Sequence, residues 1–152
     1  MGEQVLAGSL FGTALDLDRV RLHRHKWWPL QPRNVVMAPD GDIWFHPDDG
    51  LWHEDFVAAP MRLQALLVHE LTHAWQHQQG VCLLVRRHPF CRYAYRIQPG
   101  RPLRRYGIEQ QATIVEHAFL ARSVGRPIPV LEQILAEAGF SDASRFNEAQ
   151  EA

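Results

Sequence analysis

The sequence lacks long apolar runs and carries almost no net charge. No stretch of about 18 consecutive apolar residues occurs among its 152 residues, so no membrane span is expected. The opening MGEQVLAGSLFG has neither a basic start nor a sustained apolar core and does not resemble a signal peptide. A formal net charge of −1 argues against a general nucleic-acid-binding surface. We therefore expect a cytoplasmic protein with neither a membrane nor a nucleic-acid partner. Export by a route that needs no signal peptide is the alternative.

Cysteine is also scarce, with only Cys82 and Cys91 in the chain. Their spacing matches no CxxC metal or redox pair. A disulfide between them would fit an exported protein, but without an export signal we expect two reduced thiols.

Length and composition are those of one ordinary globular domain. Hydrophobic residues make up 46% of the chain and charged residues 22%, and no internal repeat is present. We expect a single domain over residues 1–140, followed by a polar, frayed tail over residues 141–152.

Short strands are expected before residue 60. Val20 and Leu22 alternate with basic residues, as in a half-buried strand. NVVMAPDGDIWFHP predicts strands at 35–37 and 43–45 around a Pro-Asp-Gly turn, followed by a loop. The basic cluster at 21–26 is interpreted as a solvated strand face rather than an anion- or nucleic-acid-binding patch.

Helices are predicted at residues 3–12, 60–80, 106–123 and 129–138. Pro60 suits a first helical position and Gly80 suits a left-handed cap. The apolar character of the 60–80 helix predicts that it is buried. Residues 81–105 are expected to form a covering loop with a strand at 93–97.

The buried helix contains an H-E-x-x-H motif in ALLVHELTHAWQHQQG. His69 and His73 are four residues apart, a helical rotation of about 40°, so their imidazoles share one face and could bind one zinc ion. Glu70 lies beside the first ligand, where it could act as general base on a water molecule. Two core histidines with satisfied hydrogen bonds and a surface glutamate are the alternative. It is disfavoured because buried His and Glu without partners cost free energy.

A zinc site of this kind needs a third protein ligand. The extended H-E-x-x-H-x-x-G-x-x-H motif is excluded, because Gln76 and Gln79 occupy its Gly and His positions. His77 is on the same straight helix and cannot easily reach the metal, so we expect it to support a ligand or to lie at the rim of the site. On the next predicted helix, Glu109 and Glu116 share a face, and we favour Glu109. Two histidines and one glutamate leave an open fourth position, as in catalytic sites.

These motifs resemble a known family. HELTH followed by a helical glutamate resembles the gluzincin branch of the zincin metallopeptidases. FGTALDLDRVRLHR, APDGDIWFHPDD, HELTHAWQHQQG and EQQATIVEHAF resemble more narrowly a bacterial group of Vgr-related proteins, which are similar to short metallopeptidase domains with an HExxHxxQ helix. The resemblance spans residues 5–125. It implies one zinc ion per chain, His69, His73 and Glu109 as ligands, and Glu70 as catalytic base.

The chain departs from the gluzincin pattern at one position. Many gluzincins have an aspartate four residues after the ligand glutamate, where it supports a ligand histidine, but this chain has Thr113. Glu116 or Asp55 are the alternatives for that support. A peptidase also needs an electrophilic group for the developing oxyanion. The candidates are Tyr93, Tyr95, Tyr106, His117 and Arg105.

The predicted fold is α+β and zincin-like, with a small antiparallel sheet packed on the HExxH helix and further helices around it. Residues 43–46 are the expected edge strand for an extended substrate, with Trp44 and Phe45 alternating between core and cleft. The predicted function is zinc-dependent hydrolysis of peptide bonds in a peptide or protein substrate. One alternative is a zinc-binding accessory domain with little or no activity, linked to bacterial secretion-system components. Another is a metal-free helical interaction domain.

Overall fold

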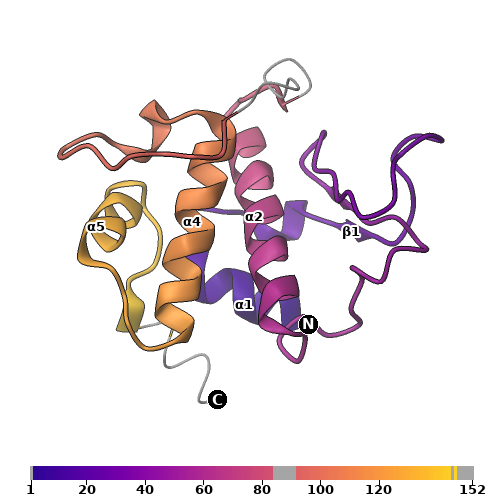
Figure 1. The fold of residues 1–152 in the computed structure, drawn as a ribbon, viewed down its shortest axis with the longest axis horizontal. Coiled ribbons are helices and arrows are strands. Elements are labelled where there is room, and N and C mark those ends of the chain that lie inside the picture. Colours follow the sequence, from indigo (N-terminus) through magenta and orange to yellow (C-terminus); the bar gives the residue numbers. More distant parts are fainter. Residues whose placement is uncertain (1, 84–91, 145, 147–152) are drawn as a thin grey trace.

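The computed structural model describes residues 2–83, 92–144 and 146. Two antiparallel helices, α2 (Met61–Gln78) and α4 (Ile108–Ser123), lie side by side at its centre (Figure 1). Two shorter helices flank this pair: α5 (Pro129–Glu137) packs on the far side of α4, and α1 (Gly2–Phe11) packs against α2. Two short 3-10 turns, η1 (Leu17–Arg19) and η2 (Leu103–Arg105), lie in the connecting segments.

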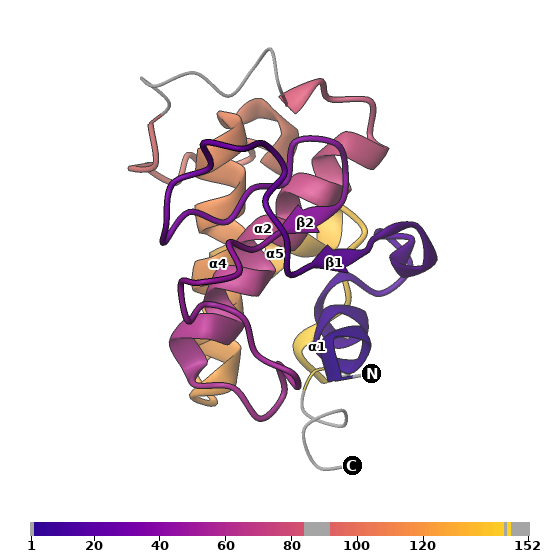
Figure 2. The same ribbon diagram turned by 90° about the vertical axis from the view of Figure 1, so that its right-hand side faces the viewer.

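A small sheet covers the side of α2 that faces away from α4 (Figure 2). It contains β1 (Leu22–His23) and β2 (Ile43–Trp44). The fold is therefore α+β, with four α-helices and two short strands in the described ranges. No helix in those ranges has the length and apolar character required to cross a membrane.

One hydrophobic core joins these elements. Leu10 of α1, Phe45 beside β2, Leu67 of α2 and Phe119 of α4 are each fully buried. Burial of each such side chain contributes about 1.5–3 kcal/mol relative to exposure. Because α2 contacts the sheet on one side and α4 on the other, it is the most enclosed helix, as predicted from its apolar sequence.

The predicted helices are confirmed to within about two residues at each end. Pro60 immediately precedes α2, and Gly80 follows it with a φ of +82°, the left-handed conformation that a glycine cap allows. Pro129 is the first residue of α5, where its missing N–H costs nothing.

The expectation of an antiparallel sheet is wrong in its main pairing. Strands β1 and β2 are parallel, with Leu22 opposite Ile43, while the predicted hairpin is reduced to one antiparallel bridge between Met37 and Trp44. Prolines at positions 39 and 47 flank the bridge and β2, and a proline has no N–H with which to extend a ladder. The predicted strand at 93–97 is also wrong: these residues are described, but they pair with no strand.

The segment expected to be a frayed tail makes specific contacts where it is described. Ser141 donates its backbone N–H to the carbonyl of Leu10, and Phe146 is buried against Phe119. Of the two cysteines, Cys82 is an exposed free thiol. Cys91 lies outside the described residues.

Candidate metal centre

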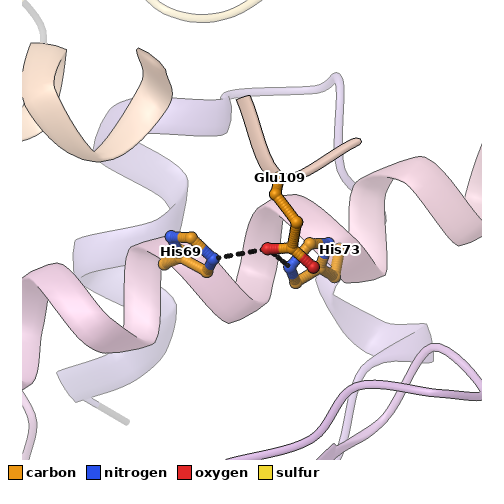
Figure 3. A group of neighbouring side chains, drawn as sticks. All are labelled: His69, His73 and Glu109. Carbon is orange, nitrogen blue, oxygen red and sulfur yellow. Dashed lines mark hydrogen bonds and ion pairs between the residues drawn. The ribbon is translucent and has the colours of Figure 1, made fainter. Parts of the chain in front are cut away.

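Three buried side chains from two helices meet between α2 and α4. His69 and His73 project from consecutive turns of α2, and Glu109 projects from the first turn of α4 (Figure 3). Their exposed fractions are 9%, 0% and 1%. One ligand atom from each lies within 4.8 Å of the other two, so the group could hold a metal ion.

The ring nitrogens converge on one point near the Glu109 carboxylate. Glu109 Oε2 lies 3.2 Å from His69 Nε2 and 3.3 Å from His73 Nε2. Despite this proximity, His73 Nε2 is buried without a hydrogen bond to any described residue. A buried nitrogen of this kind fits a metal ligand, since an unsatisfied polar atom otherwise costs about 1–3 kcal/mol.

Glu70 lies next to this group on α2 and is 3% exposed. Its Oε2 is also buried without a hydrogen-bond partner in the described part of the chain. Unlike Glu109, it is not part of the three-residue group. Glu70 therefore lies beside the three converging side chains without being one of them.

Glu116 supports the first histidine from the third turn of α4. Its Oε2 lies 3.0 Å from His69 Nδ1, which leaves Nε2 of that ring facing Glu109. Thr113 does not take this place, because its hydroxyl donates to the backbone carbonyl of Glu109 at 2.9 Å. Asp55 accepts instead from the backbone N–H of Val57.

A chain of amides supports the second histidine. The Gln76 side chain donates through Nε2 to the carbonyl of Ile108 and to Gln111 Oε1, so its Oε1 faces His73 Nδ1 at 2.9 Å as an acceptor. His73 must therefore carry its proton on Nδ1, which leaves the lone pair of Nε2 directed at the group. Sequence reasoning missed this role, although the i, i+3 spacing of His73 and Gln76 on one helix was a signal for it.

The carboxylates around His69 determine its protonation. Burial disfavours the imidazolium form, but hydrogen bonds to Glu109 and Glu116 and the charge of Glu70 outweigh burial and raise the pKa of His69 to about 9. Without a metal, the ring is therefore protonated at neutral pH. A metal ion bound at Nε2 would replace that proton.

The group opens onto a cleft of about 610 Å³. Its lining includes His69, Glu70 and Glu116 from the two helices, and Val35 and Val36 from the segment before β2. The ring of Tyr93 lies over His69, with 6.2 Å between ring centroids and an angle of 26°. A molecule in this cleft would contact His69 of the group and Glu70, whereas His73 and Glu109 lie behind the lining.

Two of the candidates for the oxyanion-stabilising group lie close together. Tyr95 and His117 form a pair at the cleft, with the Tyr95 hydroxyl 2.7 Å from His117 Nδ1. Burial, with the nearby Tyr106 and Glu116, raises the pKa of Tyr95, which keeps its phenol protonated and able to donate.

Three of the candidates lie away from the group. Tyr106 is buried, accepts from the backbone N–H of Gln98 and lies beneath the Arg101 guanidinium. Arg105 is exposed, and its carbonyl accepts from Arg101. His77 lies against the backbone of Gly41, where any Cβ would approach His77 Nδ1 to 2.6 Å.

The predicted substrate edge at residues 43–46 is wrong. The backbone N–H groups of Ile43 and Phe45 donate to the carbonyls of Arg21 and His23. On the other side, Trp44 exchanges two hydrogen bonds with Met37. Both edges of β2 are thus occupied, because the basic segment before it supplies a parallel neighbour. The segment 34–36 lines the cleft instead.

Comparison with known proteins places the chain in a family, although no family model matches it. It is 40% identical over 131 residues to the type VI secretion system spike protein VgrG2b of Pseudomonas aeruginosa, an alignment that covers 80% of this chain but 13% of that protein. The solved effector domain of P. aeruginosa VgrG2b superposes with a TM-score of 0.70 and 35% identity, over 96% of this chain and 79% of that domain. The chain belongs to the VgrG2b effector-domain family. This membership confirms the Vgr-related resemblance.

Proposed function

We propose that this member of the VgrG2b effector-domain family is a zinc-dependent peptidase domain of the gluzincin type, with a single zincin-like fold. The observation that carries the proposal is the convergence of two imidazole nitrogens and one carboxylate oxygen within 4.8 Å of one another, beside an unbonded carboxylate oxygen of Glu70. Two nitrogen ligands and one oxygen ligand with an open side are typical of catalytic zinc.

In this proposal each residue has one task. His69, His73 and Glu109 would hold the ion, which would supply a Lewis acid for a peptide carbonyl and lower the pKa of a water molecule. The Glu70 carboxylate would accept the proton of the attacking water and deliver it to the leaving amine. Burial suits Glu70 to this work, since few water molecules compete for its oxygens.

The cleft supplies the remaining parts. His117, held by the Tyr95 hydroxyl, lies on the cleft wall, where a ring N–H could donate to the developing oxyanion. Residues 34–36 also line the cleft, and their backbone could pair with an extended peptide. The substrate is accordingly proposed to be an extended peptide segment.

The second candidate is a zinc-binding accessory module without peptidase activity. Family membership favours this candidate. The related full-length protein is named a secretion spike protein, and the aligned part makes up 13% of it. On either proposal, the domain would work in association with a type VI secretion spike.

Metal analysis with matched variants tests the zinc proposal. The purified chain should contain about one zinc per molecule, and His73→Ala should lose it because one of three ligands is removed. His77→Ala is the matched control: it lies one turn further along α2, away from the group, and should retain zinc. If the chain binds no zinc, both zinc proposals are wrong, and the metal-free interaction domain is the hypothesis that remains.

Peptide cleavage separates the two zinc proposals. Glu70→Gln should keep zinc but lower the cleavage rate by at least about a thousandfold, since it removes the proposed base. The assay is a peptide library with mass-spectrometric detection, with His77→Ala again as control. Zinc-loaded wild-type protein that cleaves no peptide would support the accessory module.

A further inference from the structure

Two adjacent tryptophans protrude from the segment between β1 and the Met37 bridge. We call residues 24–35 the tryptophan loop; it forms part of the chain that projects away from the helices beyond β1 (Figure 1). Trp27 and Trp28 are 37% and 40% exposed, and Leu30 at the tip is 75% exposed. Large apolar side chains grouped on a surface in this way are typical of an interaction site.

The loop is fixed in shape by one buried side chain. Gln31 is 3% exposed, and its Oε1 accepts from the backbone N–H of Trp27 while its Nε2 donates to the carbonyls of Val35 and Trp44. The Gln31 backbone N–H closes a turn on the carbonyl of Trp28, with a proline at the favoured second position. The apolar tip is thus held outward before any partner arrives, which lowers the entropic cost of docking.

The longer segment that contains the tryptophan loop is cationic. Residues 19–39 contain five arginines or lysines and no aspartate or glutamate, whereas the whole chain has a net charge of −1. Arg24 has an acidic neighbour at 3.6 Å, but this pair is exposed and worth little. Lys26 and Arg33, on either side of the tip, have no ion pair with a described residue.

We propose that the tryptophan loop docks the domain on an anionic phospholipid surface. Tryptophan is favoured at the depth of lipid headgroups, where its ring is buried and its N–H stays hydrated. Cations beside it gain from the negative surface potential. A protruding apolar tip suits a soft planar surface, and the charge of the stretch selects an anionic one.

This proposal goes beyond the peptidase function and does not depend on it. It revises the expectation of no membrane partner, which rested on the lack of a spanning segment, because surface docking needs none. Residues 34 and 35 at the end of the loop also line the cleft, so docking would hold the mouth of the cleft close to the membrane.

Vesicle flotation tests the proposal with two probes: pure phosphatidylcholine vesicles and mixed phosphatidylcholine–phosphatidylglycerol vesicles. Wild-type protein should bind the mixed vesicles and bind the pure ones at least about tenfold less. Trp27→Ser with Trp28→Ser should reduce partition at least about tenfold, and Lys26→Gln with Arg33→Gln roughly 10- to 30-fold.

A control variant removes similar side chains elsewhere. Val124→Ser with Arg104→Gln and Arg126→Gln alters exposed residues outside the loop and should bind like wild type. Unchanged zinc content and circular dichroism would show that each variant folds. Trp27→Phe with Trp28→Phe should keep binding but lose the blue shift of tryptophan fluorescence seen with wild-type protein on the mixed vesicles.

Three results would overturn the proposal. The first is equal binding to both kinds of vesicle, and the second is undiminished binding by the folded double serine variant. The third is no vesicle binding at all, as expected for a loop that docks on a protein. None of these results affects the zinc measurement, so the two proposals fail separately.

Discussion

At the residue scale, the candidate metal centre differs from the gluzincin pattern in where its supporting carboxylate lies. The pattern has an aspartate four residues after the ligand glutamate, and this chain has Thr113 there, bonded to its own helix backbone. Glu116, nearly one helical turn further along α4, reaches His69 Nδ1 at 3.0 Å with its longer side chain. In the proposed zinc site, Glu116 would thus take the supporting role that the pattern gives to the aspartate.

Replacement of this carboxylate should weaken metal binding. Glu116→Gln removes the charge that orients His69 and raises its basicity, so zinc affinity should fall about 10- to 100-fold. Competition with a chromophoric chelator measures the change. Thr113→Ala is the control and should leave the affinity nearly unchanged, since its hydroxyl donates to the backbone carbonyl of Glu109 rather than to a histidine. An affinity unaffected by Glu116→Gln would show that this hydrogen bond has no supporting role.

At the scale of elements, helices followed from the sequence and the sheet did not. The ends of α2 and α5 are encoded locally, by Pro60, Gly80 and Pro129, and the apolar stripe of α2 gives its orientation. The parallel pairing of Leu22 with Ile43 depends on residues about twenty apart and on a long intervening loop, for which no local pattern exists.

The candidate metal centre likewise has features that local sequence predicts and features that it does not. The four-residue spacing of His69 and His73 was sufficient to predict that they share a face, because helix geometry fixes it. The choice between Glu109 and Glu116 could not follow from spacing, since both lie on one face of α4; only the contact of α4 with α2 shows which reaches both rings. The support of His73 by Gln76 has a local signal, but its tautomer depends on the distant Ile108 and Gln111.

One buried arginine joins α4, α5 and the last described segment. Arg122 is 3% exposed, makes a two-pronged ion pair with Glu132, and donates to the carbonyl of Ser141 at 2.7 Å. Arg122→Ala should destabilise the fold by roughly 2–4 kcal/mol, because it leaves a carboxylate and a buried carbonyl without their partner. Urea unfolding measures the loss. Exposed Arg126→Ala should change stability by less than about 0.5 kcal/mol, and an equal effect of both variants would contradict the assigned role.

At the scale of the whole molecule, the buried group between α2 and α4 concentrates charge where the fold is most enclosed. Glu70 and Glu109 are both almost fully buried, and His69 lies between Glu109 and Glu116. In the metal-free protein the protonated imidazole of His69 is the cation that balances these carboxylates. A bound metal would take over that balance, so metal content and pH should affect the stability of the whole domain together.

The stability of the metal-free domain should fall as pH rises above neutrality. The folded-state pKa of His69, about 9, lies above its ordinary value of 6.5. The stabilisation is therefore complete below about pH 6.5 and is lost as pH rises to about 9, by an amount on the order of 3 kcal/mol. Urea unfolding with a chelator, at about pH 6 and about pH 9, measures this loss. With zinc bound, His69 is neutral at both values, so this contribution should vanish. The metal-free His69→Gln variant should also lack this pH-dependent contribution. A metal-free wild-type domain that is equally stable at about pH 6 and about pH 9 would show that His69 does not balance the carboxylates.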